Sequence, residues 1–179
     1  MDTWKWTPQS KLCFVTTGAT APFTALIESV LQSSTLDALR ANGYTHLLVQ
    51  YGSAKDVFEK RSDAARTHID ESKEQGPLIV DGIDFNPDGL QAQFKLVQQS
   101  KGLVISHAGT MTTHPIIVQR YVTCAGSGSI LEALRFQVPL IVVPNTALLD
   151  NHQEELAVAM ERSNYLIRGD ARCVSTPNL

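Results

Sequence analysis

Residues 102–134, GLVISHAGTMTTHPIIVQRYVTCAGSGSILEAL, contain the stretch that decides the fold. The stretch begins with a short apolar run, Leu103–Ser106, which predicts a buried strand. It leads into the amphipathic segment Ser129–Phe136, which predicts a helix. Two clusters of small residues, SHAG and CAGSGS, lie between these elements. A strand, a glycine-containing loop and a helix in this order are typical of parallel α/β sheets.

Strand and helix patterns alternate along the rest of the chain. Ala54–Gln75 is polar without a clear apolar stripe, so we predict a surface helix or loop there. The alternation predicts one domain over residues 1–179, an α/β Rossmann-like fold with a doubly wound parallel sheet. The other predicted strands are Leu12–Val15, His46–Tyr51, Pro77–Phe85, Pro139–Val143 and Tyr165–Ile167, and the other predicted helices are Phe23–Leu31, Leu36–Asn42, Leu90–Ser100 and Asn151–Arg162.

Ligands of doubly wound sheets bind outside the carboxyl ends of the strands. Three loops follow predicted strands at that edge: TTGAT at residues 16–20, the SHAG and AGSGS clusters, and PNTALLDNHQ at residues 144–153. We therefore expect the functional residues in these loops.

Composition limits the partners and the compartment. A net charge of −3 gives no basic surface for nucleic acid. The cysteines Cys13, Cys124 and Cys173 are odd in number and far apart, which indicates reduced thiols in the cytoplasm. The segment MDTWKWTPQSKLCFV lacks a signal-peptide pattern, and no window approaches the ~20 apolar residues of a spanning helix. We expect a cytoplasmic chain with no membrane anchor of its own.

The AGSGSILEAL segment is a candidate phosphate site. Ser127 or Ser129 can cap the helix, and its free N–H groups and dipole favour a phosphate. Glu132, expected in the first turn, is explained either by the helix dipole or as an acceptor for ribose hydroxyls. An ordinary glycine turn before a capped helix remains an alternative on spacing alone.

Several other chemistries do not match the sequence. GxxxxGK[ST], GxGxxG after the first strand and GxSxG are all missing, which disfavours a P-loop nucleotidase, a dehydrogenase and a serine hydrolase. No DxD pair could bridge a metal to a diphosphate, and the five histidines form no HxxxH or CxxC group. We therefore expect no metal and no cofactor.

Six segments together carry a family resemblance: FVTTGAT, LLVQYG, ISHAG, SGSILEAL, VPLIVVPN and LLDNHQEELA. They resemble the cytosolic catalytic subunits of the two-subunit UDP-N-acetylglucosamine transferase. That family adds the second N-acetylglucosamine to the dolichol-linked precursor of N-glycans. It is similar to the donor half of the bacterial transferase that makes the lipid-linked peptidoglycan precursor. The resemblance implies a metal-independent glycosyltransferase with one GT-B donor-binding half and UDP-GlcNAc as donor.

The resemblance also implies roles for particular residues. His107 is the one candidate for a general base, with a structural role in the loop as the alternative. Glu132 is expected to accept the ribose hydroxyls, and no residue is assigned to the uracil. The expected donor-binding residues are Thr17, Gly18, Thr20, Gly109, Ser127, Gly128, Ser129, Glu132, Asn151 and Gln153.

A partner follows from the same resemblance. One Rossmann-like half cannot build the acceptor wall, so we expect a membrane-anchored, acceptor-binding subunit. That subunit would recruit this chain to the cytosolic face of the endoplasmic reticulum, where the acceptor is dolichol-linked. A catalytically silent subunit for nucleotide-sugar binding or assembly remains the alternative function.

Residues 110–126 interrupt the family loop. Without them the chain would contain ISHAGSGSILEAL, the uninterrupted loop. We expect an insertion here that weakens donor binding, because loss of preorganisation of ~1 Å can cost ~100-fold in rate. Two origins remain open: a translated intron, for which glycine and Cys-Ala-Gly codons can supply the splice signals, and a real loop with Ile116–Val122 as a strand.

Overall fold

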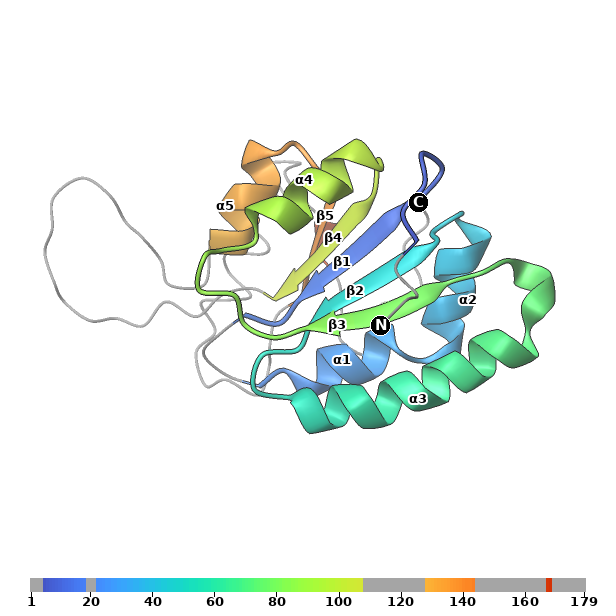
Figure 1. Ribbon diagram of the computed structural model, residues 1–179. Helices are drawn as coiled ribbons and strands as arrows, with labels where there is room; N and C mark the ends of the chain where they lie inside the picture. Colours follow the sequence, from blue (N-terminus) through green and yellow to red (C-terminus); the bar gives the residue numbers. More distant parts are fainter. Residues whose placement is uncertain (1–4, 19–21, 108–127, 144–166, 169–179) are drawn as a thin grey trace, which may run out of the picture.

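The computed structural model describes residues 5–18, 22–107, 128–143 and 167–168. Strands and helices alternate through these ranges as the sequence predicts, and the structure has the expected α/β Rossmann-like architecture (Figure 1). The elements are β1 (Leu12–Thr16), α1 (Thr24–Val30), α2 (Ser33–Ala41), β2 (His46–Gln50), α3 (Lys55–Glu71), a 3-10 turn (Lys73–Gln75), β3 (Ile79–Ile83), α4 (Gln91–Gln99), β4 (Leu103–His107), α5 (Gly128–Arg135), β5 (Leu140–Val143) and β6 (Ile167–Arg168).

The strands form one sheet in the order β3-β2-β1-β4-β5-β6, and each neighbouring pair is parallel. Every residue of β1 and β2 is buried, as expected for apolar runs covered on both faces. The strand β3 lies at an edge and is only partly buried. The strand predicted at Tyr165–Ile167 is described only at Ile167–Arg168, and the predicted helix Asn151–Arg162 lies outside the described residues.

Two hydrophobic layers enclose the sheet. Helices α1, α2 and α3 cover one face, and α4 and α5 cover the other (Figure 1). The first layer packs residues such as Leu26, Ile27 and Phe58 against the sheet. The second packs Phe94 of α4 edge-on against Phe14 of β1, with ring centroids 5.8 Å apart. The buried thiol of Cys13 in β1 has its pKa raised to about 12 by desolvation, so it behaves as a small hydrophobic side chain.

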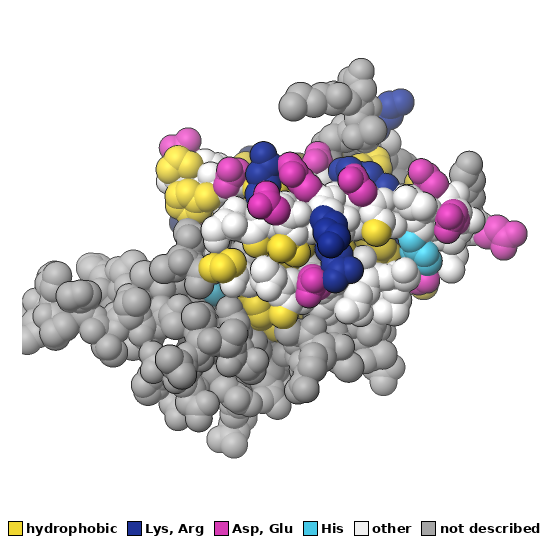
Figure 2. All heavy atoms as spheres, turned by 90° about the horizontal axis from the view of Figure 1, so that it is seen from below, with side chains coloured by type: hydrophobic (Ala, Val, Ile, Leu, Met, Phe, Trp, Pro, Cys, Tyr) yellow, Lys and Arg dark blue, Asp and Glu magenta, His cyan; other side chains and the backbone are white. Residues whose placement is uncertain are grey.

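The helix α3 confirms the helix that was one of the two predictions for Ala54–Gln75. It covers the 17 residues Lys55–Glu71 and has a buried stripe, although the sequence showed no clear one. Two of the four stripe residues, Ser62 and Ala65, are small or polar, so the apolar pattern is weak even though the face is buried. The outer face of the helical layer carries interspersed acidic and basic side chains (Figure 2), among them the exposed pairs Lys55–Glu59 and Arg61–Glu28.

Candidate nucleotide site

The carboxyl ends of β1 and β4 meet at the centre of the sheet. Thr16 and Ser106 are register partners, so the residues that follow them lie at the same edge. The chain leaves β1 toward α1 on one face and leaves β4 toward α5 on the other (Figure 1). This reversal is the topological switch point at which doubly wound sheets bind ligands. The structure therefore brings the predicted residues Thr17, Gly18 and His107 to one crevice edge.

Gly18 and the imidazole of His107 are in close contact. Gly18 has a φ of +78°, and an ideal Cβ built on it would lie 2.6 Å from Nε2 of His107. Glycine is therefore required here both by the left-handed backbone and by the approach of the ring. Burial lowers the pKa of His107, and the backbone of Thr16 offsets part of that effect. The ring is consequently neutral near pH 7 and able to accept a proton.

Nδ1 of His107 is buried and has no hydrogen-bond partner within the described residues. A buried polar atom that makes no hydrogen bond lowers the stability of the folded protein, and a further group that bonds to it removes this loss. The imidazole lies at the switch point, the edge at which doubly wound sheets bind ligands.

Two residues at the end of β2 hold the Thr16–Gly18 loop. The hydroxyl of Thr16 donates to Oε1 of Gln50 at 2.6 Å, and the hydroxyl of Thr17 donates to the carbonyl of Gln50 at 2.9 Å. A Cβ on Gly52 would lie 2.8 Å from the carbonyl oxygen of Gly18, so Gly52 permits close packing of the two loops. The sequence analysis missed both residues, although a polar residue and a glycine at a strand end were visible signals.

The start of α5 forms the opposite wall. The helix begins at Gly128, so Ser129 is its second residue rather than its cap. This corrects the alternative in which Ser129 caps the helix; the other, Ser127, lies outside the described residues. Glu132 is the fifth residue and lies beyond the first turn, which weakens the dipole explanation for its presence. Its side chain is half-buried.

Ser106, which the sequence analysis did not select, links the end of β4 to the start of α5. Ser106 of β4 is completely buried, and its Oγ lies 3.3 Å from Oγ of Ser129. The signal was a hydroxyl at the end of an apolar strand, on the side opposite to His107. The hydrogen bond fixes the start of α5 against the sheet beside the switch point.

The remaining predicted donor-binding residues lie outside the described ranges, as does the segment 110–126. For these residues the assignments stay predictions. They are Thr20, Gly109, Ser127, Asn151 and Gln153.

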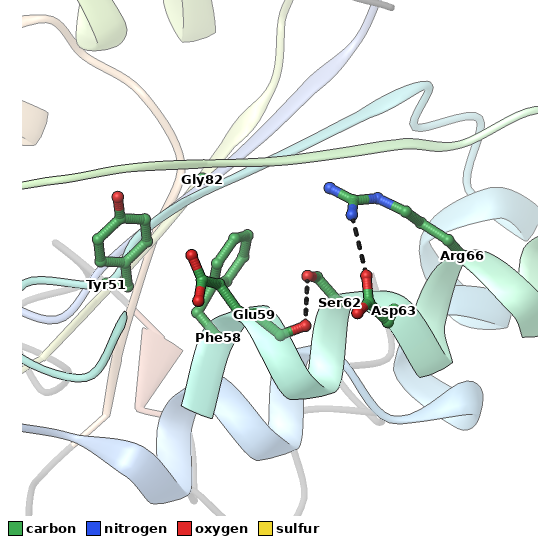
Figure 3. Close-up of a pocket in the computed structure, with 7 residues that line it drawn as sticks. All are labelled: Tyr51, Phe58, Glu59, Ser62, Asp63, Arg66 and Gly82. Carbon is green, nitrogen blue, oxygen red and sulfur yellow. Dashed lines mark hydrogen bonds and ion pairs between the residues drawn. The ribbon is translucent and has the colours of Figure 1, made fainter. Parts of the chain in front are cut away.

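A separate hollow of about 450 Å³ lies between α3 and the edge strand β3 (Figure 3). It is lined by Tyr51, Phe58, Glu59, Ser62, Asp63, Arg66 and Gly82.

Hydrogen bonds at this hollow cover the edge of the sheet. Nη2 of Arg66 donates to the carbonyl of Val80 at 3.3 Å, and the N–H of Gly82 donates to the carboxylate of Asp81 at 2.8 Å. These bonds occupy outward-facing backbone groups of β3, so the hollow is an edge cover away from the switch point.

In the described ranges, every helix is too short or too polar to span a bilayer. The same ranges hold no group of three or more histidine, cysteine, aspartate or glutamate side chains that could bind a metal ion.

The strand order defines an α/β, Rossmann-like domain of the doubly wound class. The chain matches the glycosyltransferase family 28 C-terminal domain over residues 12–118 and 120–179. It therefore belongs to glycosyltransferase family 28, among relatives named as subunits of a transferase.

Three relatives illustrate the similarity. The UDP-N-acetylglucosamine transferase subunit ALG13 of Eremothecium gossypii is 37% identical over 171 residues, which covers 89% of this chain and 76% of the relative. The subunit of the same name from Saccharomyces cerevisiae is 31% identical over 179 residues, covering 88% of this chain and 77% of the relative. A solution NMR structure of ALG13 superposes with a TM-score of 0.59 at 31% identity, covering 90% of this chain and 79% of that one.

Proposed function

We propose that this chain is the donor-binding, catalytic subunit of a UDP-N-acetylglucosamine transferase. The observation that carries the proposal is the switch point of a family 28 fold, where Gly18 contacts His107 and the neighbouring Ser106 bonds Ser129 at the start of α5. The proposed reaction moves N-acetylglucosamine from UDP-GlcNAc to GlcNAc-diphospho-dolichol, the second step in building the N-glycan precursor. The partner is a membrane-anchored, acceptor-binding subunit at the cytosolic face of the endoplasmic reticulum.

The proposed chemistry is displacement at the sugar's anomeric carbon. The acceptor hydroxyl oxygen forms a bond to that carbon, and the bond to the UDP oxygen breaks with its electron pair leaving on UDP. The N–H groups and dipole at the start of α5 stabilise the charge that grows on the diphosphate, without a metal ion. His107 takes the acceptor proton: its lowered pKa keeps the imidazole in the neutral form that can act as a base, and the same shift makes it a weaker base than a free histidine.

The test is transfer of labelled N-acetylglucosamine from UDP-GlcNAc to GlcNAc-diphospho-dolichol. Membranes carrying the partner subunit would receive either this chain or a version lacking residues 110–126. Transfer by either version supports the proposal. Activity of the shortened version alone would show that the segment impairs the donor loop, and equal activity would show that the loop tolerates it.

Glu132→Ala separates this function from a silent assembly subunit. A transferase subunit loses transfer while it still binds its partner, because only the ribose contact is removed. Absence of transfer by both loop versions, with partner binding intact, would refute the catalytic proposal in favour of the assembly role.

A further inference from the structure

A buried hydroxyl on the central strand β4 lies next to the first turn of α5. We infer that Ser106 is a positioning residue that directs the hydroxyl proton of Ser129 toward the diphosphate of a nucleotide sugar. The inference rests on the proposed function, because it needs a diphosphate at the start of α5. It is carried by two distances from Oγ of Ser106: 3.3 Å to Oγ of Ser129 and 3.1 Å to the carbonyl oxygen of His107.

The hydroxyl protons of Ser106 and Ser129 can be arranged in two ways. A serine hydroxyl has one proton to donate and two lone pairs to accept with, whereas the carbonyl of His107 can only accept. Ser106 therefore cannot donate to His107 and to Ser129 at the same time. If it donates to His107, then Ser129 must donate inward to Ser106. If it donates to Ser129, then the proton of Ser129 is free for another acceptor.

A phosphate oxygen needs the second arrangement. An ionised phosphate oxygen accepts hydrogen bonds, so a hydroxyl that presents only lone pairs to it is repelled. Binding of a diphosphate beside Ser129 therefore selects the state in which Ser106 donates to Ser129. Chains of hydrogen bonds strengthen one another inside a protein, so the donation from Ser106 also makes Ser129 a better donor.

Among the described residues, the register partners of Ser106 do not replace it. Ser106 is completely buried, so solvent is not a ready source of the proton. Its register partner on β1, Thr16, donates its own proton to Gln50 at 2.6 Å. Its register partner on β5 is the apolar Val142. Within the described part of the chain, the direction in which Ser129 donates its proton thus depends on the hydroxyl of Ser106.

The packing of α5 on the sheet stabilises the hydrogen bond between Ser106 and Ser129. Ile130 and Ala133 of α5 are buried in the same layer as β4, so the first turn cannot move away without exposing them. Ser129 itself is half-buried, with Ser106 on its inner side. Ser106 therefore acts through Ser129 and needs no contact with the ligand of its own.

The test is a double-mutant cycle on UDP binding. The full 179-residue chain, Ser106→Ala, Ser129→Ala and the double variant would be titrated with UDP by isothermal calorimetry. We expect Ser106→Ala to raise Kd by up to about 5-fold, because Ser129 keeps its own proton but loses the donated hydrogen bond that orients and polarises its hydroxyl. We expect the double variant to bind no more weakly than Ser129→Ala, because Ser106 has no other route to the ligand.

Folding is controlled separately. Urea unfolding of each variant shows whether it is folded at the temperature of the titration. Ser106→Cys is the second variant: it keeps the volume of the side chain but donates weakly, so its Kd should fall between those of the wild type and Ser106→Ala. A merely structural serine would not give this order together with the non-additive cycle.

Each outcome decides something. Unchanged affinity of the Ser106 variants, or additive losses in the double variant, would overturn the role of Ser106 while UDP binding by the wild type preserves the proposed function. Failure to bind UDP by both the full chain and the version lacking residues 110–126 would overturn both. Weakened binding with a non-additive cycle supports both.

Discussion

The imidazole of His107 occupies the space into which a side chain on Gly18 would project. An ideal Cβ at Gly18 lies 2.6 Å from Nε2 and 3.1 Å from Nδ1 of the ring. The ring therefore packs on the backbone of the loop after β1. This contact joins the ends of two strands that bound the proposed donor crevice, so a single atom added at Gly18 tests it.

Gly18→Ala should unfold at lower urea and lose UDP binding. The positive φ costs ~1–2 kcal/mol for an alanine, and displacement of the buried ring adds ~1–3 kcal/mol. Gly43→Ala is the matched control, because Gly43 has a φ of +75° but open space around its Cβ position. If both variants lose the same stability, the ring contact contributes nothing beyond backbone strain.

Gly82→Ala tests the packing of the edge strand. A Cβ there would lie 2.5 Å from Cζ of Phe58, a ring that stacks on Tyr51 with centroids 5.2 Å apart. We expect a loss of ~1–3 kcal/mol in the free energy of unfolding, from overpacking without backbone strain. Adding Phe58→Leu should recover part of the loss in the double variant, measured by urea unfolding. No recovery would mean that the strain lies elsewhere.

Stability should fall when the solution is acidified below about pH 6.5, the usual pKa of histidine. Burial lowers the pKa of both His46 and His107 in the folded protein. At pH values below the usual histidine pKa, the unfolded chain binds more protons at these two residues than the folded chain does. Unfolding therefore becomes more favourable as pH falls. Urea unfolding at pH 7.5 and 5.5 measures this difference, and His107→Asn should make it smaller. An unchanged difference in that variant would refute the contribution of His107.

Arg66→Ala should promote self-association more than it destabilises the fold. The side chain of Arg66 is 51% exposed, so its ion pair with Asp63 contributes within ~1 kcal/mol. Its removal frees the carbonyl of Val80 at the sheet edge, where another strand can pair. Sedimentation velocity at increasing concentration measures the association. Arg61→Ala, which removes an exposed pair away from the edge, is the control and should stay unchanged.

Much of the fold was predictable because its signals are local. Continuous apolar runs at Leu12–Val15 and His46–Tyr51 predicted strands that the structure buries on both faces, with ends that differ by one residue. The turn after β3 is equally local: the side chain of Asn86 accepts the N–H of Asp88 at 3.1 Å, a bond within the turn-forming residues Asn-Pro-Asp-Gly themselves.

Local patterns failed where burial is decided by neighbours. Ser62 and Ala65 of α3 carry little apolar signal, yet they lie on the buried stripe because small side chains let the helix approach the sheet. The start of α5 at Gly128 likewise placed Ser129 and Glu132 two positions further into the helix than a cap at Ser129 would have done.

By itself the sequence determined the alternation of strands and helices, the parallel sheet and the edge at which the glycine loops lie. It could not determine which side chains of that edge meet. Gly18 contacts His107, and Ser106 bonds Ser129 across 23 residues of chain, only because the strand order places β1 beside β4 and packs α5 on β4. Such contacts depend on the three-dimensional course of the whole chain, whereas strand and helix patterns depend on neighbours in sequence.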